Sequence, residues 1–488
     1  MKLFGFRGGV HPPTHKELSA AKPIERLPLP KTLYVPLQQH VGAPATALVQ
    51  VGQQVLKGEL LGHSQGKVSA PVHAPTSGVV AAITEVTAAH PSGLSVLAVV
   101  IETDGEERWP DSDPPPDPFS LPPEEVAKQV ADAGIVGLGG ACFPSAVKLD
   151  LARREGVHTV LINGAECEPY LTGDDRLMRE LPEQIIDGVL LVRHATQACR
   201  ALIVVEDNKP EAIAALTAAS QDCAEIKVVK VPTRYPMGSD KQMIQMVMGQ
   251  EVPAGARSPE TGVVVYNVGT AYAVHRALRF GQPLLSRIVT VSGEAVANPC
   301  NLEVPIGTPV AELLAYCGYQ PEHTDRLLMG GPMMGLPLPN TTVPIVKGLN
   351  GVLALTAAEV AEQPSHPCVR CGRCVDACPM GLMPVELAKR SEHGDVDGAL
   401  SFGLETCMVC GSCAYACPAH IPIVQYLESA KGELAERASV EKKAQATRRA
   451  AEQHQARLER EERAKAEAAA RRKAERAARN KKAKKASV

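Results

Sequence analysis

Two patterns of apolar residues divide the chain. Between about residues 31 and 103, short runs of Val, Leu and Ala alternate with Gly and Pro, as in residues 51–58 and 74–80. This pattern predicts a small all-β module of tight hairpins. From Pro123 onward, helical spacing of apolar residues alternates with short β-type runs, which predicts a largely parallel sheet with helices on its faces.

The α/β segment yields individual elements. Helices are expected over residues 123–132, 146–154, 182–194 and after Pro210, and strands over 159–162, 201–205 and 226–231. Residues 287–335 return to strands and turns and are similar to a small β-grasp module of the soluble-ligand-binding type. The loop at residues 330–335 that closes this module is either a simple turn or a contact site.

A stiff linker separates the first two modules, because seven prolines lie between Pro110 and Pro123. The predicted organisation is an N-terminal module at 1–108, a linker at 109–123, an α/β domain at 124–282, a β-grasp module at 283–340, a cysteine-rich module at 360–430 and a tail at 431–488.

Composition agrees with several folded modules. A chain of 488 residues with 45% hydrophobic and 22% charged residues is an ordinary globular protein, so wholly disordered, collagen-like and coiled-coil classes are excluded. No run of eighteen apolar residues occurs, and the first fifteen residues lack the apolar region of a signal peptide. We therefore expect a chain that neither crosses a membrane by itself nor is exported by that route.

Charge is segregated at the C-terminus. Residues 441–488 contain 17 Lys and Arg against 7 Glu, a net charge of +10, while the remainder carries −13. Leu458 and Val488 are the larger apolar residues there, so the segment favours helix but offers no stripe to bury. We expect a solvated or partly disordered helix, with a partner or an anionic membrane surface as the alternative contact.

Eight of the fourteen cysteines form two runs of identical spacing, 39 residues apart. The runs are Cys368-x2-Cys371-x2-Cys374-x3-Cys378-Pro379 and Cys407-x2-Cys410-x2-Cys413-x3-Cys417-Pro418. This is the spacing of bacterial two-cluster ferredoxins, in which the fourth cysteine of each run ligates the other cluster. The predicted sets are Cys368, Cys371, Cys374 and Cys417 for cluster 1, and Cys407, Cys410, Cys413 and Cys378 for cluster 2. Zinc is the alternative, but zinc ribbons use pairs of cysteines rather than runs of four.

Each run precedes an expected helix, at residues 385–391 and 423–429. This gives the pseudo-twofold layout of a ferredoxin with two [4Fe-4S] clusters, which together form a short electron wire.

A glycine-rich stretch at residues 134–148 suggests a cofactor site that could exchange electrons with these clusters. Alone it is weak evidence, but three more patches follow in order, at residues 163–169, 235–240 and 266–270. Together the four resemble the flavin-bearing, NADH-oxidising subunit of respiratory complex I. The glycines would let backbone amides approach a phosphate or the flavin ring, and Lys148 would neutralise the phosphate.

The resemblance assigns roles residue by residue. It implies an FMN site formed by Gly137, Gly139, Gly140, Lys148, Asn163, Glu166, Tyr235, Gly238, Asn267 and Thr270. Phe143 would stack on NAD(H), with Glu168 near its nicotinamide. This chain departs from the complex I pattern at Leu138, Cys142, Ala165 and Ser239-Asp240, so the resemblance supports FMN more strongly than the nucleotide.

The N-terminal module resembles the barrel-sandwich hybrid fold of lipoyl and biotinyl domains. Lys67 lies eleven positions before Gly78, as a carrier lysine would, but the flank at residues 63–66 differs from that of carrier domains. We expect an unmodified turn lysine.

The order of modules resembles the C subunit family of the Rnf (Rsx) electron transport complex. The family implies electron transfer between NAD(H) and ferredoxin or another iron-sulfur protein, with membrane partner subunits that translocate Na⁺ or H⁺. It further implies a peripheral place on the cytoplasmic side of the inner membrane and no nucleic-acid partner. Two alternatives remain: a soluble flavin and iron-sulfur corrinoid reductase, and a non-enzymatic electron-wiring scaffold with an empty flavin fold.

Overall fold

The computed structural model describes residues 2–90, 92–111 and 113–485. It divides into two compact units, Met1–Val385 with Thr406–Val424, and Glu386–Glu405 with Gln425–Val488. The first unit holds the β modules, the α/β domain and all eight cysteines of the two runs.

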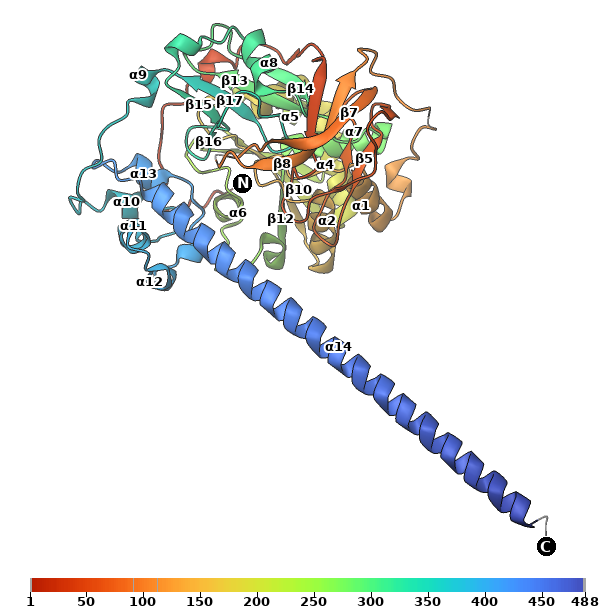
Figure 1. Ribbon diagram of the computed structural model, residues 1–488. Helices are drawn as coiled ribbons and strands as arrows, with labels where there is room; N and C mark the ends of the chain where they lie inside the picture. Colours follow the sequence, from red (N-terminus) through yellow and green to blue (C-terminus); the bar gives the residue numbers. More distant parts are fainter. Residues whose placement is uncertain (1, 91, 112, 486–488) are drawn as a thin grey trace. The chain divides into compact units, whose positions relative to one another are not determined.

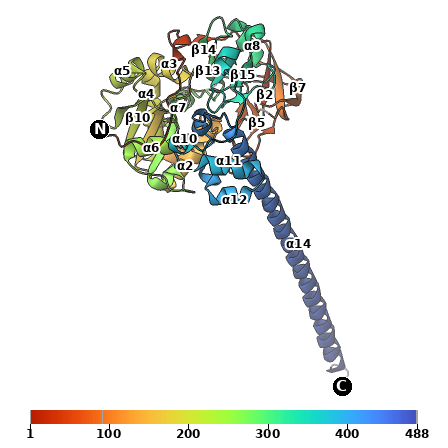
Figure 2. The same ribbon diagram turned by 90° about the vertical axis from the view of Figure 1, so that its left-hand side faces the viewer.

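The N-terminal module is all-β, as predicted. One antiparallel sheet has the order β2 (Thr32–Pro36), β8 (Ser95–Thr103), β7 (Gly78–Thr87) and β4 (Gln54–Val55), and a second has β3 (Thr46–Ala47), β5 (Leu60–His63) and β6 (Val72–His73). Figure 2 shows β2, β5 and β7 of this module together. Their inward side chains, including Leu33, Leu61 and Ile101, are fully buried. Lys67 is exposed between β5 and β6.

A four-stranded parallel sheet forms the centre of the α/β domain. Its order is β11 (Ile226–Val231), β10 (Arg200–Glu206), β9 (Thr159–Gly164) and β12 (Val263–Asn267). Alternate residues serve its two faces, as a period of two requires. On one face the sheet packs against helices α2 (Ser145–Arg154), α3 (Gly173–Glu180), α4 (Pro182–Thr196), α5 (Pro210–Ala219) and α7 (Val268–Phe280), and α1 (Pro123–Asp132) packs on α2, α4 and α7. On the other it packs against α6 (Asp240–Met248) and Phe6.

The expected elements of this domain all occur within a few residues of their predicted limits. The sequence did not indicate α3 or α6. The patch at residues 266–270, where β12 ends and α7 begins, was predicted as part of the flavin site but not as a strand and a helix.

The β-grasp sheet extends beyond its predicted limits of 283 and 340. Its order is β1 (Glu25–Arg26), β14 (Cys300–Pro305), β13 (Ser286–Ser292), β17 (Gly351–Leu355), β15 (Arg326–Met329) and β16 (Leu336–Pro337), with helix α8 (Val310–Tyr316). The central strand β17 therefore lies past residue 340, and the edge strand β1 comes from the N-terminal segment. Strand pairing over such sequence distances leaves no local signal.

Short helices complete the fold. Those of 3-10 type lie at Lys16–Leu18, Pro118–Ser120, Ser258–Thr261, Pro321–His323 and Leu404–Thr406. The α-helical ones are α9 (Ala357–Val360), α10 (Arg373–Ala377), α11 (Pro384–Glu392), α12 (Val396–Ser401) and α13 (Ser412–Tyr415).

Helix α14 (Ile423–Lys485) is one uninterrupted element, drawn in blue in Figure 1. The helix expected at 423–429 is its beginning, and the charged tail continues it. In the second unit the buried apolar side chains include Leu387, Val396 and Leu427, whereas nearly all side chains described after Glu433 are exposed. In the part of the chain that the structure describes, no helix is both long and apolar enough to cross a membrane.

Truncation after Glu433 is expected to leave the folded body intact. The exposed Arg437–Asp397 ion pair is lost, and such pairs contribute at most about 1 kcal/mol. Thermal unfolding should shift by no more than about 2–4 °C, with flavin and iron contents equal to those of the full chain. Loss of iron or flavin would show that the tail has a structural role.

Candidate functional site

The predicted flavin residues gather at the carboxyl edge of the parallel sheet. Strand β9 pairs with β10 on one side and with β12 on the other, and Asn163 lies in register opposite Asn267. The chain leaves these neighbouring strands in different directions, so the edge between them is a topological switch point. Ligands of open α/β sheets bind in the crevice at such a point.

The glycine-rich loop lies against the N-terminus of α7. Gly137 donates its amide to the Phe143 carbonyl at 2.8 Å, and the Leu138 amide donates to Thr270 Oγ1 at 2.9 Å. A Cβ at Gly139 would lie 3.4 Å from Cβ of Asn267, and Gly140 has a φ of 102°. The backbone conformation at Gly140 therefore favours glycine, whereas a Cβ at Gly139 would make an ordinary van der Waals contact.

Asn163 holds together two turns of this edge. Its Nδ2 donates to the Gly238 carbonyl at 2.8 Å, and its Oδ1 accepts from the Ala165 amide at 3.1 Å. The Gly238 amide in turn donates to Cys167 Sγ at 3.3 Å. Cys167 is therefore a hydrogen-bond acceptor in the site, and burial raises the pKa of its thiol.

Lys148 reaches the same edge from α2. Its Nζ donates to the Val265 carbonyl at 2.7 Å and lies 5.2 Å from the centre of the Tyr266 ring. Burial lowers the pKa of this amine. The amine, the loop amides and the α7 N-terminus present positive charge that a phosphate would complement, so these residues fit the phosphate end of a flavin nucleotide.

The two predicted glutamates have protein partners. Glu166 accepts from the amides of Asp174 at 2.7 Å and Asp175 at 3.2 Å, at the start of α3, and burial raises its pKa. Glu168 accepts from the amides of Met333 at 3.0 Å and Met334 at 2.9 Å. The loop at residues 330–335 is thus a contact site rather than a free turn.

Buried cations that the sequence did not indicate support the turn after β9. Lys16 Nζ donates to the carbonyls of Glu166 and Glu168, each at 2.9 Å, and also to Leu171. Lys209 Nζ donates to the Ala165 carbonyl at 2.6 Å and pairs with Glu206 at 3.1 Å. The turn thereby satisfies its carbonyls without strand partners.

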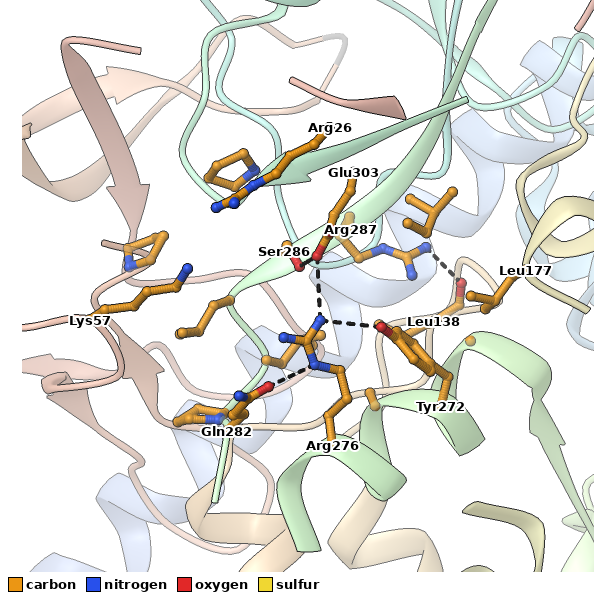
Figure 3. A pocket seen from close by; sticks show the side chains of 18 of the residues that line it. Arg26, Lys57, Leu138, Leu177, Tyr272, Arg276, Gln282, Ser286, Arg287 and Glu303 are labelled. Carbon is orange, nitrogen blue, oxygen red and sulfur yellow. Dashed lines mark hydrogen bonds and ion pairs between the residues drawn. The ribbon is translucent and has the colours of Figure 1, made fainter. Parts of the chain in front are cut away.

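A pocket lies where the barrel, the α/β domain and the β-grasp sheet meet (Figure 3). Arg276 crosses it, donating to Gln282 at 2.8 Å, Tyr272 at 3.2 Å and Glu303 at 3.4 Å. At its inner end, Arg287 Nη2 donates to the Leu138 carbonyl at 3.1 Å. Arg287, from β13, therefore braces the glycine-rich loop from outside the α/β domain.

The two cysteine runs share one backbone conformation. Arg370 and Val409 have φ values of 54° and 56°, and Gly372 and Gly411 have 79° and 78°. The Arg370 amide donates to Cys368 Sγ at 3.4 Å and the Val409 amide to Cys407 Sγ at 3.4 Å. Amide donors around cysteine sulfurs are a feature of iron-sulfur sites, so both runs fit a cluster.

The pKa values of two cysteine thiols are influenced by cysteines of the opposite run. Burial, together with Cys410, Cys407 and Cys378, raises the pKa of Cys413 to about 12. Burial also raises the pKa of Cys374, and Cys417 contributes to that increase. The thiol of each closing cysteine therefore interacts electrostatically with a thiol of the opposite run. The crossed ligand sets stay a prediction.

Family models match four segments of the chain. They are the RnfC barrel sandwich hybrid domain at residues 4–106, the Nuo51 FMN-binding domain at 130–276, the SLBB domain at 288–337 and the 4Fe-4S dicluster domain at 367–421.

Three relatives, each named as the C subunit of an ion-translocating oxidoreductase complex, illustrate the similarity. The protein of Rhodobacter capsulatus is 52% identical over 90% of this chain and 85% of its own length. That of Serratia proteamaculans is 48% identical over 89% and 62%, and that of Pseudomonas aeruginosa 46% over 93% and 59%. Among solved structures, a NAD⁺-reducing [NiFe]-hydrogenase matches with a TM-score of 0.46 and 21% identity, over 59% of this chain and 54% of its own.

Glu168 should make stability depend on pH. Burial raises its pKa to about 7, above the value of about 4.3 in an unfolded chain. The folded state then binds this proton more tightly, so the contribution of Glu168 to stability is greatest below about pH 4.3 and is lost as the pH rises through about 7. Thermal unfolding of Glu168→Gln from about pH 5 to about pH 8 should show a shallower decline than the wild type.

The exposed Glu251→Gln variant is the control and should keep the wild-type slope. Equal slopes for the Glu168→Gln and wild-type proteins would show that this carboxyl is ionised as readily in the fold as in the unfolded chain.

Proposed function

The chain belongs to the family of C subunits of ion-translocating oxidoreductase complexes, and on that premise we propose that it passes electrons between NAD(H) and a ferredoxin or another iron-sulfur acceptor. It has an FMN-binding domain and a 4Fe-4S dicluster domain, and it is an electron-transfer subunit of an oxidoreductase complex. The proposal adds NAD(H) as the hydride carrier and two [4Fe-4S] clusters with crossed ligands. It also adds a peripheral place on the cytoplasmic side of the inner membrane, beside partner subunits that translocate Na⁺ or H⁺.

The observation that supports this proposal most strongly is the contact between its two halves. Tyr235, in the loop after β11 that also carries Gly238, donates its hydroxyl to the Cys410 carbonyl at 2.7 Å. One side chain therefore joins the candidate flavin edge to a predicted cluster ligand, within one compact unit.

The chain's own part in the reaction is to bind, orient and exclude water. FMN, when bound, exchanges two electrons with a nicotinamide as a hydride and passes single electrons to clusters. Lys148, the glycine-loop amides and the α7 N-terminus would hold its phosphate. Asn163 would keep the turns of Ala165 and Gly238 in place, and the buried contacts around Tyr235 would keep water away from the path to the clusters.

Measuring flavin, iron and acid-labile sulfide on protein purified without oxygen tests the proposal directly. We expect FMN, iron for two cubes and NADH-dependent dye reduction in one preparation. Iron without flavin would favour a wiring scaffold and overturn the proposal.

Lys148→Ala should weaken FMN retention. A charge-assisted contact to phosphate is worth roughly 1.5–3 kcal/mol, so the flavin dissociation constant should rise on the order of 10- to 100-fold while iron content stays unchanged. Flavin fluorescence titration measures this, with the exposed Lys227→Ala as a matched control. Equal affinity in both variants would remove Lys148 from the site.

Crossed ligation is tested by paired substitutions. Cys378→Ser should perturb the same paramagnetic signal as Cys407→Ser, and Cys417→Ser the same one as Cys368→Ser, since each cube draws on both runs. Electron paramagnetic resonance of anaerobically reduced protein distinguishes the two signals. If Cys378→Ser instead groups with Cys368→Ser, each run closes its own site.

A further inference from the structure

Residues 4–10, which we call the strap, lie on the α/β domain rather than in the barrel. Phe6 is 6% exposed and packs into the apolar cluster between the sheet and α6. The Phe4 amide donates to the Met246 carbonyl of α6 at 2.9 Å. The Arg234 guanidinium lies 4.7 Å from the centre of the Phe6 ring and donates to the Phe6 carbonyl at 3.1 Å. These contacts fix the strap to the α/β domain, which carries the candidate flavin site.

The far end of the strap is paired with Tyr235. Val10 and Tyr235 exchange backbone hydrogen bonds at 2.9 and 3.0 Å as an antiparallel bridge. The Tyr235 side chain, 3% exposed, continues from this bridge to the Cys410 carbonyl. Val10, Tyr235, Ala377 and Cys410 form one buried cluster, with Met333 and Met408 at its margin.

The middle of the strap touches the first cysteine run. The Gly9 amide donates to the Ala377 carbonyl at 2.9 Å. A Cβ at Gly8 would lie 2.5 Å from the carbonyl carbon and oxygen of Cys378. Gly8 and Gly9 have φ values of 66° and 81°, so backbone conformation and space both require glycine here.

These contacts converge on a single predicted cluster. Cys378 closes the first run, and Cys410 belongs to the second, yet crossed ligation assigns both to cluster 2. The strap contacts the backbone of one and Tyr235 that of the other. Gln242 of α6 adds a contact at 3.4 Å to the carbonyl of Pro379, the residue after Cys378.

We propose that the strap and Tyr235 act as a clamp that positions cluster 2 against the flavin-binding edge. Tyr235 is a positioning residue: its hydroxyl is directed at the ligand-bearing backbone, and its amide and carbonyl hold the strap. The clamp fixes the position of cluster 2 relative to the flavin-binding edge and shields that cluster from water. Solvent exposure is one determinant of a cluster's potential. This inference rests on the proposed function, because it presumes a cluster at these cysteines.

A glycine pair in the strap provides a matched test. Gly5 and Gly8 both have positive φ, 88° and 66°, but a Cβ at Gly5 meets no atom within 4 Å. Gly5→Ala and Gly8→Ala both place a side chain at a positive φ, and only Gly8→Ala pushes against Cys378. We expect Gly8→Ala to alter the paramagnetic signal that Cys378→Ser alters, and Gly5→Ala to match the wild type. Identical spectra for the two alanine variants would overturn the clamp.

Tyr235→Phe tests the contact between the Tyr235 hydroxyl and the Cys410 carbonyl. Because this substitution removes only a hydroxyl, it still tests the proposal if Gly8→Ala does not fold. We expect the midpoint potential of one cluster to shift while the other keeps its wild-type value. We also expect hydrogen exchange of the amides at 407–413 to rise by about 3- to 10-fold in the full chain, because a buried hydrogen bond is lost. Tyr316→Phe, which loses a 2.8 Å hydrogen bond to Glu25, should change neither.

Unchanged potentials and exchange in Tyr235→Phe would reduce the contact to packing and refute the proposal. Failure of the proposed function would look different: wild-type protein would lack flavin, whereas the clamp is read from cluster signals and amide exchange, which need no flavin.

Discussion

The parallel pairing of β9 with both β10 and β12 is the constraint on which the site depends. Strands on either side of β9 require the chain to depart in opposite directions at their carboxyl ends, so helices cannot cover that edge. Asn163 and Asn267 sit opposite each other there, and both use their side chains to close local turns. These two turns shape the carboxyl edge of the sheet, and the glycine-rich loop and Lys148 both lie at that edge.

The turn at that edge places polar groups in the protein interior, and two lysines offset the cost of removing those groups from water. The turn after β9 exposes carbonyls and two glutamates to an interior from which water is largely removed, and Lys16 and Lys209 donate to those carbonyls. Lys209 and Glu206 are 4% and 0% exposed. Removing one member of such a buried pair leaves an uncompensated charge, typically at a cost of about 3–5 kcal/mol. The turn is therefore rigid because its charges have fixed partners, which is what a cofactor site requires.

Local sequence could predict the elements whose signal is local. The runs at 159–162 and 226–231 alternate or stay apolar over a strand length, and Pro123, Pro182 and Pro210 mark helix starts, so those elements are found within a few residues. The cysteine spacing likewise carries its own geometry. The β17 pairing, the strap and Lys16 could not be predicted in this way, because each depends on a partner far along the chain. Lys16 lies 150 residues from Glu166, and nothing periodic around it indicates that contact.

The strap also explains how two locally equivalent cysteine runs come to differ. Their dihedral angles and sulfur contacts match, so the sequence of each run dictates the same loop. Their surroundings do not match: Cys368 and Cys371 are exposed, whereas Cys410 and Cys413 are buried. The group of buried side chains that packs around Cys410 includes Tyr235 of the α/β domain and Val10 of the strap. Because solvent exposure helps to set the potential of an iron-sulfur cluster, residues outside the ferredoxin motif, rather than the motif itself, make the two sites unequal.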